Sequence, residues 1–149
     1  MKKLAINAAA VVLLLAGCNK KETVTAESIL LLANHGYSLK PTTYYKITGD
    51  GVMEDTLVVM NNEDVFDTPV PAEKSVRAKE LLTKITRGML DKNGKEYHSK
   101  YPDAGGSTIT ATVSGKTYRW YITDDVEALP KYFRDFGQAV NEAVNELEQ

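Results

Sequence analysis

Cys18 is the sole cysteine in the sequence and the only side chain that offers a strong nucleophile. Its thiolate can attack an electrophilic carbon, so this residue can accept a covalently attached group. Because the sequence holds no second cysteine, an internal disulfide is excluded, and the folded part must be stable without one. Ala16 and Gly17 precede Cys18 and have the small side chains that a processing site requires. The chemistry expected at Cys18 is therefore modification of its sulfur.

The residues before Cys18 have the order of a secretory signal. Met1-Lys2-Lys3 is basic, and residues 4–17 are almost wholly apolar. This apolar run is shorter than the roughly 20 residues that a permanent membrane helix needs. Leu15-Ala16-Gly17-Cys18 resembles the lipobox of bacterial lipoproteins, which implies cleavage before Cys18 and acylation of its sulfur and of the new amino group. We therefore expect residues 1–17 to be a cleaved signal peptide and Cys18 to be the lipid attachment site.

The same resemblance implies a location. Lipoproteins of this type carry two or three acyl chains, and each buried methylene contributes about 0.8 kcal/mol, so the anchor is permanent. Asn19 follows the anchor, where Asp would imply retention at the inner membrane of enteric-type bacteria. We expect the cell envelope, at the periplasmic face of the outer membrane in a host that has one. In a host with a single membrane, the domain would face outward.

Other residues that could support catalysis or metal binding are sparse. His35 and His98 are the only histidines and do not have the spacing of zinc ligands, so we expect each in a solvated turn. The sequence has no glycine-rich phosphate loop, serine nucleophile elbow or metalloprotease helix motif. Ser107 and Thr108 follow two glycines without a base that the sequence can place nearby, and Asp50 is a turn residue. We predict no metal, no cofactor and no enzymatic activity.

The chain is rich in tyrosine, with 8 Tyr against 3 Phe. Tyrosine is favoured at protein interfaces because it buries a large area and keeps a hydrogen-bonding tip. Tyrosines in expected strands are explained by strand propensity. Tyr37, Tyr97 and Tyr101 instead fall in expected loops. We therefore predict that the loops 36–41 and 97–106 form an edge that binds a partner.

Length and charge limit the domain organisation and the partners. Without the signal about 130 residues remain, which is typical of one domain. The formal charge of −2 would become about −4 without Lys2 and Lys3, so no basic face for nucleic acid is expected. We expect residues 18–26 to be the lipidated cysteine and a flexible tether, and residues 27–149 to be a single domain.

Short apolar and β-branched segments predict an antiparallel sheet. Residues 28–33 are apolar almost throughout, which fits a buried strand or a short helix, and the following Asn-His-Gly favours a central strand. Residues 42–48 and 52–60 flank a Gly-Asp-Gly turn and form a first hairpin. Residues 108–113 and 116–123 flank a Ser-Gly turn and form a second.

Two amphipathic segments predict helices that begin at Pro71 and Pro130. Their apolar residues recur at helical spacing: Ala78, Leu81, Leu82, Ile85 and Met89 in the first, and Tyr132, Phe133, Phe136, Val140, Ala143, Val144 and Leu147 in the second. The polar residues 91–106 are expected to form a surface loop. The order β-β-β-α-β-β-α therefore predicts an α+β fold, with two helices packed on one face of an antiparallel sheet.

The turns and loops resemble those of a family of uncharacterised bacterial exported domains. The matching segments are Tyr45-Lys46-Ile47-Thr48-Gly49-Asp50-Gly51, Asp103-Ala104, residues 107–117 and residues 130–147. The layout is also similar to the emfourin-type inhibitors of the metalloprotease protealysin over most of residues 27–147. The first loop of the exported family often carries a cysteine pair, which residues 35–42 lack. The resemblance implies the fold and no functional residue.

These observations lead to one hypothesis and one alternative. We expect a lipid-anchored cell-envelope protein that acts as a protein-binding module, in its sharper form an inhibitor of an exported protease or toxin. An inhibitor needs a rigid loop, for which residues 102–106 are the candidate. The alternative is a structural or assembly lipoprotein of an envelope complex. The expected partners are the membrane, through the anchor, and an envelope protein.

Replacing Cys18 with Ala is expected to abolish incorporation of a palmitate analogue, because the substitution removes the only thiol. Metabolic labelling of the producing bacterium, followed by in-gel detection, measures the incorporation. Lys20→Ala, just beyond the anchor, is the control and should keep the label. Label on the Cys18→Ala protein would contradict the assignment.

Overall fold

The computed structural model describes residues 21–36, 42–55 and 64–149. The signal peptide at residues 1–17, the lipid attachment site Cys18 and Tyr37 lie outside the described residues, so what the sequence predicts for them stays a prediction. The same holds for residues 56–60 of the first expected hairpin. Within the described ranges, no helix has both the length and the apolar character needed to cross a membrane.

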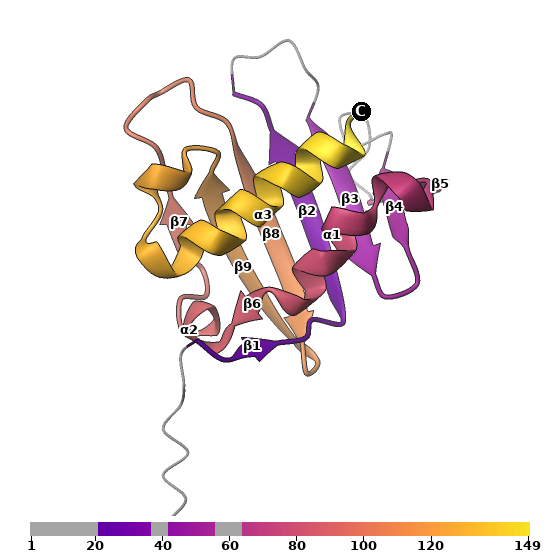
Figure 1. Cartoon of the computed structure of the whole chain (residues 1–149), viewed down its shortest axis with the longest axis horizontal. Coiled ribbons are helices and arrows are strands. Elements are labelled where there is room, and N and C mark those ends of the chain that lie inside the picture. Colours follow the sequence, from indigo (N-terminus) through magenta and orange to yellow (C-terminus); the bar gives the residue numbers. More distant parts are fainter. Residues whose placement is uncertain (1–20, 37–41, 56–63) are drawn as a thin grey trace, which may run out of the picture.

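One mixed sheet forms the centre of the fold, with strand order β5-β4-β3-β2-β8-β9-β7 (Figure 1). Its strands are β2 (Ser28–Asn34), β3 (Thr43–Thr48), β4 (Val52–Asp55), β5 (Thr68–Pro69), β7 (Glu96–Tyr97), β8 (Gly106–Val113) and β9 (Lys116–Thr123). Neighbouring strands are antiparallel except β7 and β9, which run parallel. The α+β class is therefore confirmed, and a purely antiparallel sheet is wrong.

The parallel strand β7 lies inside the segment expected to be a surface loop. Gly94 N–H donates to the Arg119 carbonyl at 2.8 Å, and Tyr121 N–H donates to the Lys95 carbonyl at 3.1 Å. Backbone pairing of this kind needs no apolar side chains, so a polar segment can take part in it. The expectation of a loop throughout residues 91–106 is therefore wrong at β7.

β2 is the central strand that the sequence predicts. On one face, Ile29, Leu31 and Ala33 are at most 2% exposed, and on the other, Leu30 and Leu32 are half-buried. Because β3 and β8 flank β2, even the side chains on the face without helices are half-buried, and the strand is apolar at nearly every position. This shielding removes the alternation that would have distinguished strand from helix in the sequence.

Both predicted hairpins are present where the structure describes them. Ser114 and Gly115 have φ angles of 50° and 71°, and positive φ at both central residues suits the tight turn between β8 and β9. In the turn between β3 and β4, Thr48 N–H donates to the Gly51 carbonyl at 2.9 Å. Turn chemistry therefore set both registers, as expected.

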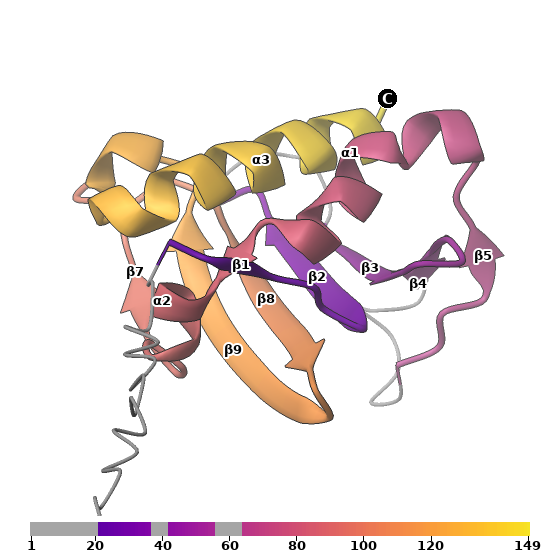
Figure 2. The ribbon, with the colours of Figure 1, turned by 60° about the horizontal axis from the view of Figure 1, so that its bottom comes forward.

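Helices cover one face of the sheet (Figure 2). These are α1 (Val76–Glu80) and α3 (Lys131–Leu147), the latter preceded by the 3₁₀ turn η3 (Val126–Ala128). Of the apolar stripe predicted for α3, only Tyr132 is misplaced, being 48% exposed. The buried residues of α3 are Phe133, Phe136, Gly137, Val140, Ala143, Val144 and Leu147.

The single helix predicted from Pro71 is wrong. The chain instead forms η1 (Ala72–Lys74), α1, η2 (Leu81–Thr83), β6 (Ile85–Thr86) and α2 (Arg87–Leu90). β6 pairs with β1 (Thr23–Val24), and this pairing competes with helix continuation. The apolar positions were nevertheless correct as core positions, since Ala78, Leu81, Leu82, Ile85 and Met89 are all buried.

The tether expected over residues 18–26 is corrected by the same pairing. Ala26 is 3% exposed and its N–H donates to the Leu82 carbonyl at 2.7 Å. Arg87 N–H donates to the Glu22 carbonyl, and the two side chains form an ion pair at 2.9 Å. Residues 22–26 therefore pack on the domain, whose edge lies several residues before the expected residue 27.

Replacing Ala26 with Asp is expected to lower the free energy of unfolding by on the order of 3 kcal/mol, because it buries a charge without a partner. Urea denaturation followed by circular dichroism measures the change. Thr25→Asp, at the exposed neighbouring position, is the matched control and should stay within about 0.5 kcal/mol of the parent. Equal and small effects of both substitutions would show that this segment is not part of the core.

Candidate functional site

Two loops that the sequence predicts to form one edge do meet at their bases. Gly36, at φ 62°, lies against residues 103–105, where a Cβ would collide with the Asp103 carbonyl oxygen and lie 3.1 Å from Gly105 N. Gly105 lies in turn against β2, where a Cβ would lie 2.6 Å from the Asn34 carbonyl oxygen. Only glycine allows backbones this close. The approach fixes the base of one loop on the base of the other.

A third segment, between β9 and η3, joins the same end of the sheet. Asp124 N–H donates to the Gly105 carbonyl at 3.1 Å, and the Thr123 hydroxyl donates to the same carbonyl at 3.3 Å. We call the surface formed by residues 34–36, 98–106 and 123–125 the loop end. It lies at the top of Figure 1, beside the C-terminus of α3.

A polar cluster ties the loop end to α3. His35 Nε2 lies 2.6 Å from Glu148 Oε1, and the Thr43 hydroxyl donates to the same carboxylate oxygen at 3.1 Å. The His35 and Glu148 side chains are only 15% and 9% exposed. The solvated turn expected around His35 is therefore wrong. Its partners come from the end of α3 and the start of β3, so nothing in the local sequence signalled the cluster.

His98 differs from His35 in being solvent-exposed, as expected. Its side chain is 62% exposed, its ring stacks on Tyr121 at 4.7 Å, and its Nε2 lies 3.2 Å from Glu96 Oε2. Among the described residues, no group of three or more His, Cys, Asp or Glu side chains has the arrangement of metal ligands. The described contacts of the two histidines are hydrogen bonds to carboxylates and, for His98, ring stacking.

A pocket of about 160 Å³ opens between the loop end and α3. Ser107 is 2% exposed, and its hydroxyl makes no hydrogen bond to another residue in the described ranges. Asp124 stands at the rim, where burial is the main cause that raises the pKa of its carboxyl; the charge of His35 lowers this pKa and that of Glu148 raises it. The remaining lining residues are Ala33, Asn34, His35, Gly106, Asn141, Val144 and Asn145.

The two described tyrosines of the predicted partner-binding edge have different surroundings. The Tyr97 ring packs on Phe133 at 4.9 Å and its hydroxyl lies 3.2 Å from that of Tyr132. Burial and this hydrogen bond raise the pKa of Tyr97. Tyr97 therefore packs on α3 while it stays partly exposed, and its role in a binding edge stays a prediction. Tyr101 is 56% exposed, so its side chain is accessible to a partner.

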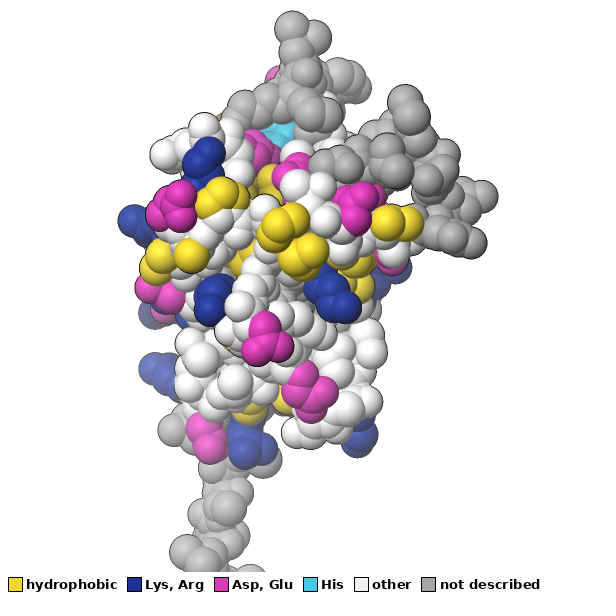
Figure 3. All heavy atoms as spheres, turned by 90° about the vertical axis from the view of Figure 1, so that its right-hand side faces the viewer, with side chains coloured by type: hydrophobic (Ala, Val, Ile, Leu, Met, Phe, Trp, Pro, Cys, Tyr) yellow, Lys and Arg dark blue, Asp and Glu magenta, His cyan; other side chains and the backbone are white. Residues whose placement is uncertain are grey.

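A second hollow, of about 570 Å³, lies beside the β3–β4 turn, β5 and the start of α1. Figure 3 shows apolar side chains gathered on this side of the molecule, with charged side chains around them. Its apolar lining includes Val52, Met53, Val70 and the 53% exposed Val76. This groove offers apolar area for contact, whereas the polar and titratable side chains described above lie at or beside the loop end.

Comparison of the chain with models of protein families, with curated proteins and with solved structures gave no match.

Replacing Asp124 with Asn is expected to stabilise the protein more at pH 7 than at pH 3. The raised pKa means that folding disfavours the ionised carboxylate. Below the unfolded-state pKa both states are protonated and the effect is absent; it develops as pH rises through the folded-state pKa. Urea midpoints across pH measure the difference between variant and parent.

Asp91→Asn, on the exposed C-terminal side of α2, is the control for removal of one negative charge. A difference between Asp124→Asn and the parent that stays constant across the pH range would contradict the prediction.

Proposed function

We propose that this chain is a lipid-anchored protein of the cell envelope that binds another protein through its loop end. The observation that carries the proposal is the glycine-packed base of that surface, where Gly36 and Gly105 hold two loops together. A surface that is ordered before binding loses less conformational entropy when it binds. The loop end is therefore suited to recognition by contact.

Hydrogen bonds also order the loop that carries Tyr101. The Ser99 hydroxyl donates to Asp125 Oδ2 at 2.8 Å and accepts from Tyr101 N–H at 3.1 Å. Ala104 N–H donates to the Tyr101 carbonyl at 3.2 Å. These bonds link the loop to the start of η3 and close a turn within it. Tyr101 is thus an exposed aromatic side chain on an ordered backbone.

Exposed aromatics on ordered backbone are typical binding anchors, because tyrosine is over-represented among residues that dominate binding energy. Lys100 Nζ lies 5.1 Å from the centre of the Tyr101 ring, which restricts the ring further. We assign to Tyr101 the main contact with the partner. Residues 102–106, which complete this loop, are the segment that an exported protease or toxin would meet.

The position of the expected anchor is consistent with this role. The described chain begins at residue 21 beside β1 and α2, at the end of the sheet opposite the loop end (Figure 1). A lipid on Cys18 would hold the β1 side toward the membrane. The loop end would then point away from the lipid, toward proteins in the aqueous space.

Incorporation of a photo-cross-linking benzoylphenylalanine at position 101 is expected to capture a specific protein in the producing bacterium. Thr117, exposed on β9 at the opposite end of the sheet, is the matched control position and should not capture it. With the captured protein purified, Tyr101→Ala should weaken binding at least about tenfold, as expected for an anchor residue.

The identity of the captured protein separates the two hypotheses. An exported protease or toxin whose activity is inhibited by the parent protein and not by Tyr101→Ala supports the inhibitor form. A stable constituent of a membrane complex supports the structural alternative. The same cross-links at positions 101 and 117, or none at 101, would contradict binding through the loop end.

A further inference from the structure

The pocket of about 160 Å³ beneath the loop end, which we call the Ser107 pocket, is lined by a serine to which no described residue forms a hydrogen bond. Ser107 belongs to β8 and points to the face that α3 covers, where it is 2% exposed. Its hydroxyl opens into the pocket and makes no hydrogen bond to any residue in the described ranges. No fully buried side-chain oxygen or nitrogen of the described residues lacks a partner, so this hydroxyl is reached through the pocket, where a hydrogen-bonding ligand would meet it.

The charge on the pocket indicates what kind of ligand this is. The Asp124 carboxylate stands over Gly105 and accepts no hydrogen bond from other described side chains or backbone. Glu148 is outside the described lining and is bonded to His35 and Thr43. The lining residues include neither Lys nor Arg. Asp124 is the one carboxylate among the described lining residues, and its negative charge complements a cation.

The size and the lining of the pocket indicate the shape of the ligand that it can hold. Small-molecule sites are typically about 300–1,000 Å³, whereas this pocket is about 160 Å³, enough for one extended side chain. Ala33 and Val144 provide apolar wall for an alkyl stem. Asn34, Asn141 and Asn145 provide amide groups near the mouth. A side chain with a charged group on a flexible apolar stem fits both the apolar wall and the polar mouth of the pocket.

We propose that the Ser107 pocket receives a lysine or arginine side chain of the protein bound at the loop end, with Asp124 as its counter-ion. The inference rests on the proposed function and names the chemistry of the partner. The ammonium or guanidinium group pairs with the Asp124 carboxylate and donates to the Ser107 hydroxyl oxygen. Tyr101, on the neighbouring loop, contacts the partner beside this residue.

Titration of the full-length protein in detergent with N-acetyl-argininamide and N-acetyl-lysinamide tests the pocket directly. The measurement is the change in amide NMR shifts of Asn34, Ser107 and Asp124. At least one of the two cationic amides is expected to give saturable shifts at these positions. N-acetyl-citrullinamide, which has the shape of arginine without its charge, is the neutral control and should give none.

Two variants test the assigned roles. Asp124→Asn should weaken binding of the cationic amide at least tenfold, and Ser107→Ala should weaken it by a smaller factor. Asp103→Asn, exposed on the same loop end and outside the pocket lining, is the matched control and should bind as the parent does. The spectra themselves show whether each variant remains folded.

The outcomes distinguish this inference from the proposed function. Equal shifts with the citrulline compound, unchanged binding by Asp124→Asn, or no shifts up to the solubility limit would overturn the pocket assignment. If position 101 still captures its protein in that case, binding through the loop end stands without the pocket. If the cationic amides bind and position 101 captures nothing, the pocket takes free cations and the proposed function fails.

Discussion

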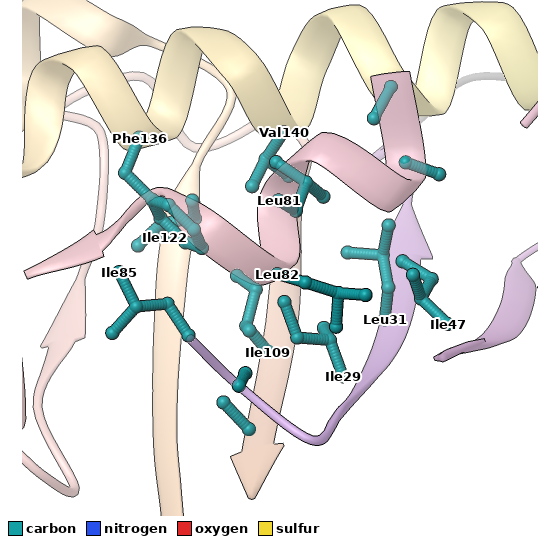
Figure 4. Close-up of a cluster of buried hydrophobic side chains, with 14 of the residues drawn as sticks. Ile29, Leu31, Ile47, Leu81, Leu82, Ile85, Ile109, Ile122, Phe136 and Val140 are labelled. Atoms are coloured by element: carbon teal, nitrogen blue, oxygen red, sulfur yellow. The ribbon is translucent and has the colours of Figure 1, made fainter. Parts of the chain in front are cut away.

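The packing of α3 across one face of the sheet is the interaction on which the rest of the structure depends. Figure 4 shows Phe136 and Val140 of α3 directed toward the apolar side chains of the central strands. The chain has one cysteine, so apolar burial must supply stability that a disulfide otherwise would. Because α3 crosses the sheet toward the end of β2, it also brings Glu148 to His35. One packing event therefore builds the core and places the polar cluster.

The loop end contains one group that does not favour folding. Asp124 carries a carboxyl whose ionisation burial opposes. An aspartate-to-asparagine change would relieve this penalty, so the carboxyl at this position has no explanation in stability alone. Polar groups retained at a disadvantage to the fold are typical of sites that bind.

Local signals in the sequence were sufficient for the long strands, and insufficient for the short strands β6 and β7 and for contacts between distant residues. β2, β8 and β9 follow from apolar or alternating residues that end in turn chemistry. The helix predicted from Pro71 failed because Ile85 pairs with Val24, a strand contact that helical spacing cannot reveal. The His35–Glu148 pair joins residues 113 positions apart, and each side chain alone is typical of an exposed turn or helix end. Likewise, Gly36 and Gly105 have the composition of ordinary loops until their packing is known.

The two ends of the sheet have separate roles if the lipid is attached where the sequence indicates. β2 has 7 residues and therefore extends about 20 Å between its two ends. Residues 22–26 pack on the domain near β6 and α2, which leaves only a few residues between Cys18 and the folded part. A tether this short cannot carry the loop end back to the bilayer. The rigid sheet would instead hold Tyr101 and the Ser107 pocket away from the lipid headgroups, facing the aqueous space.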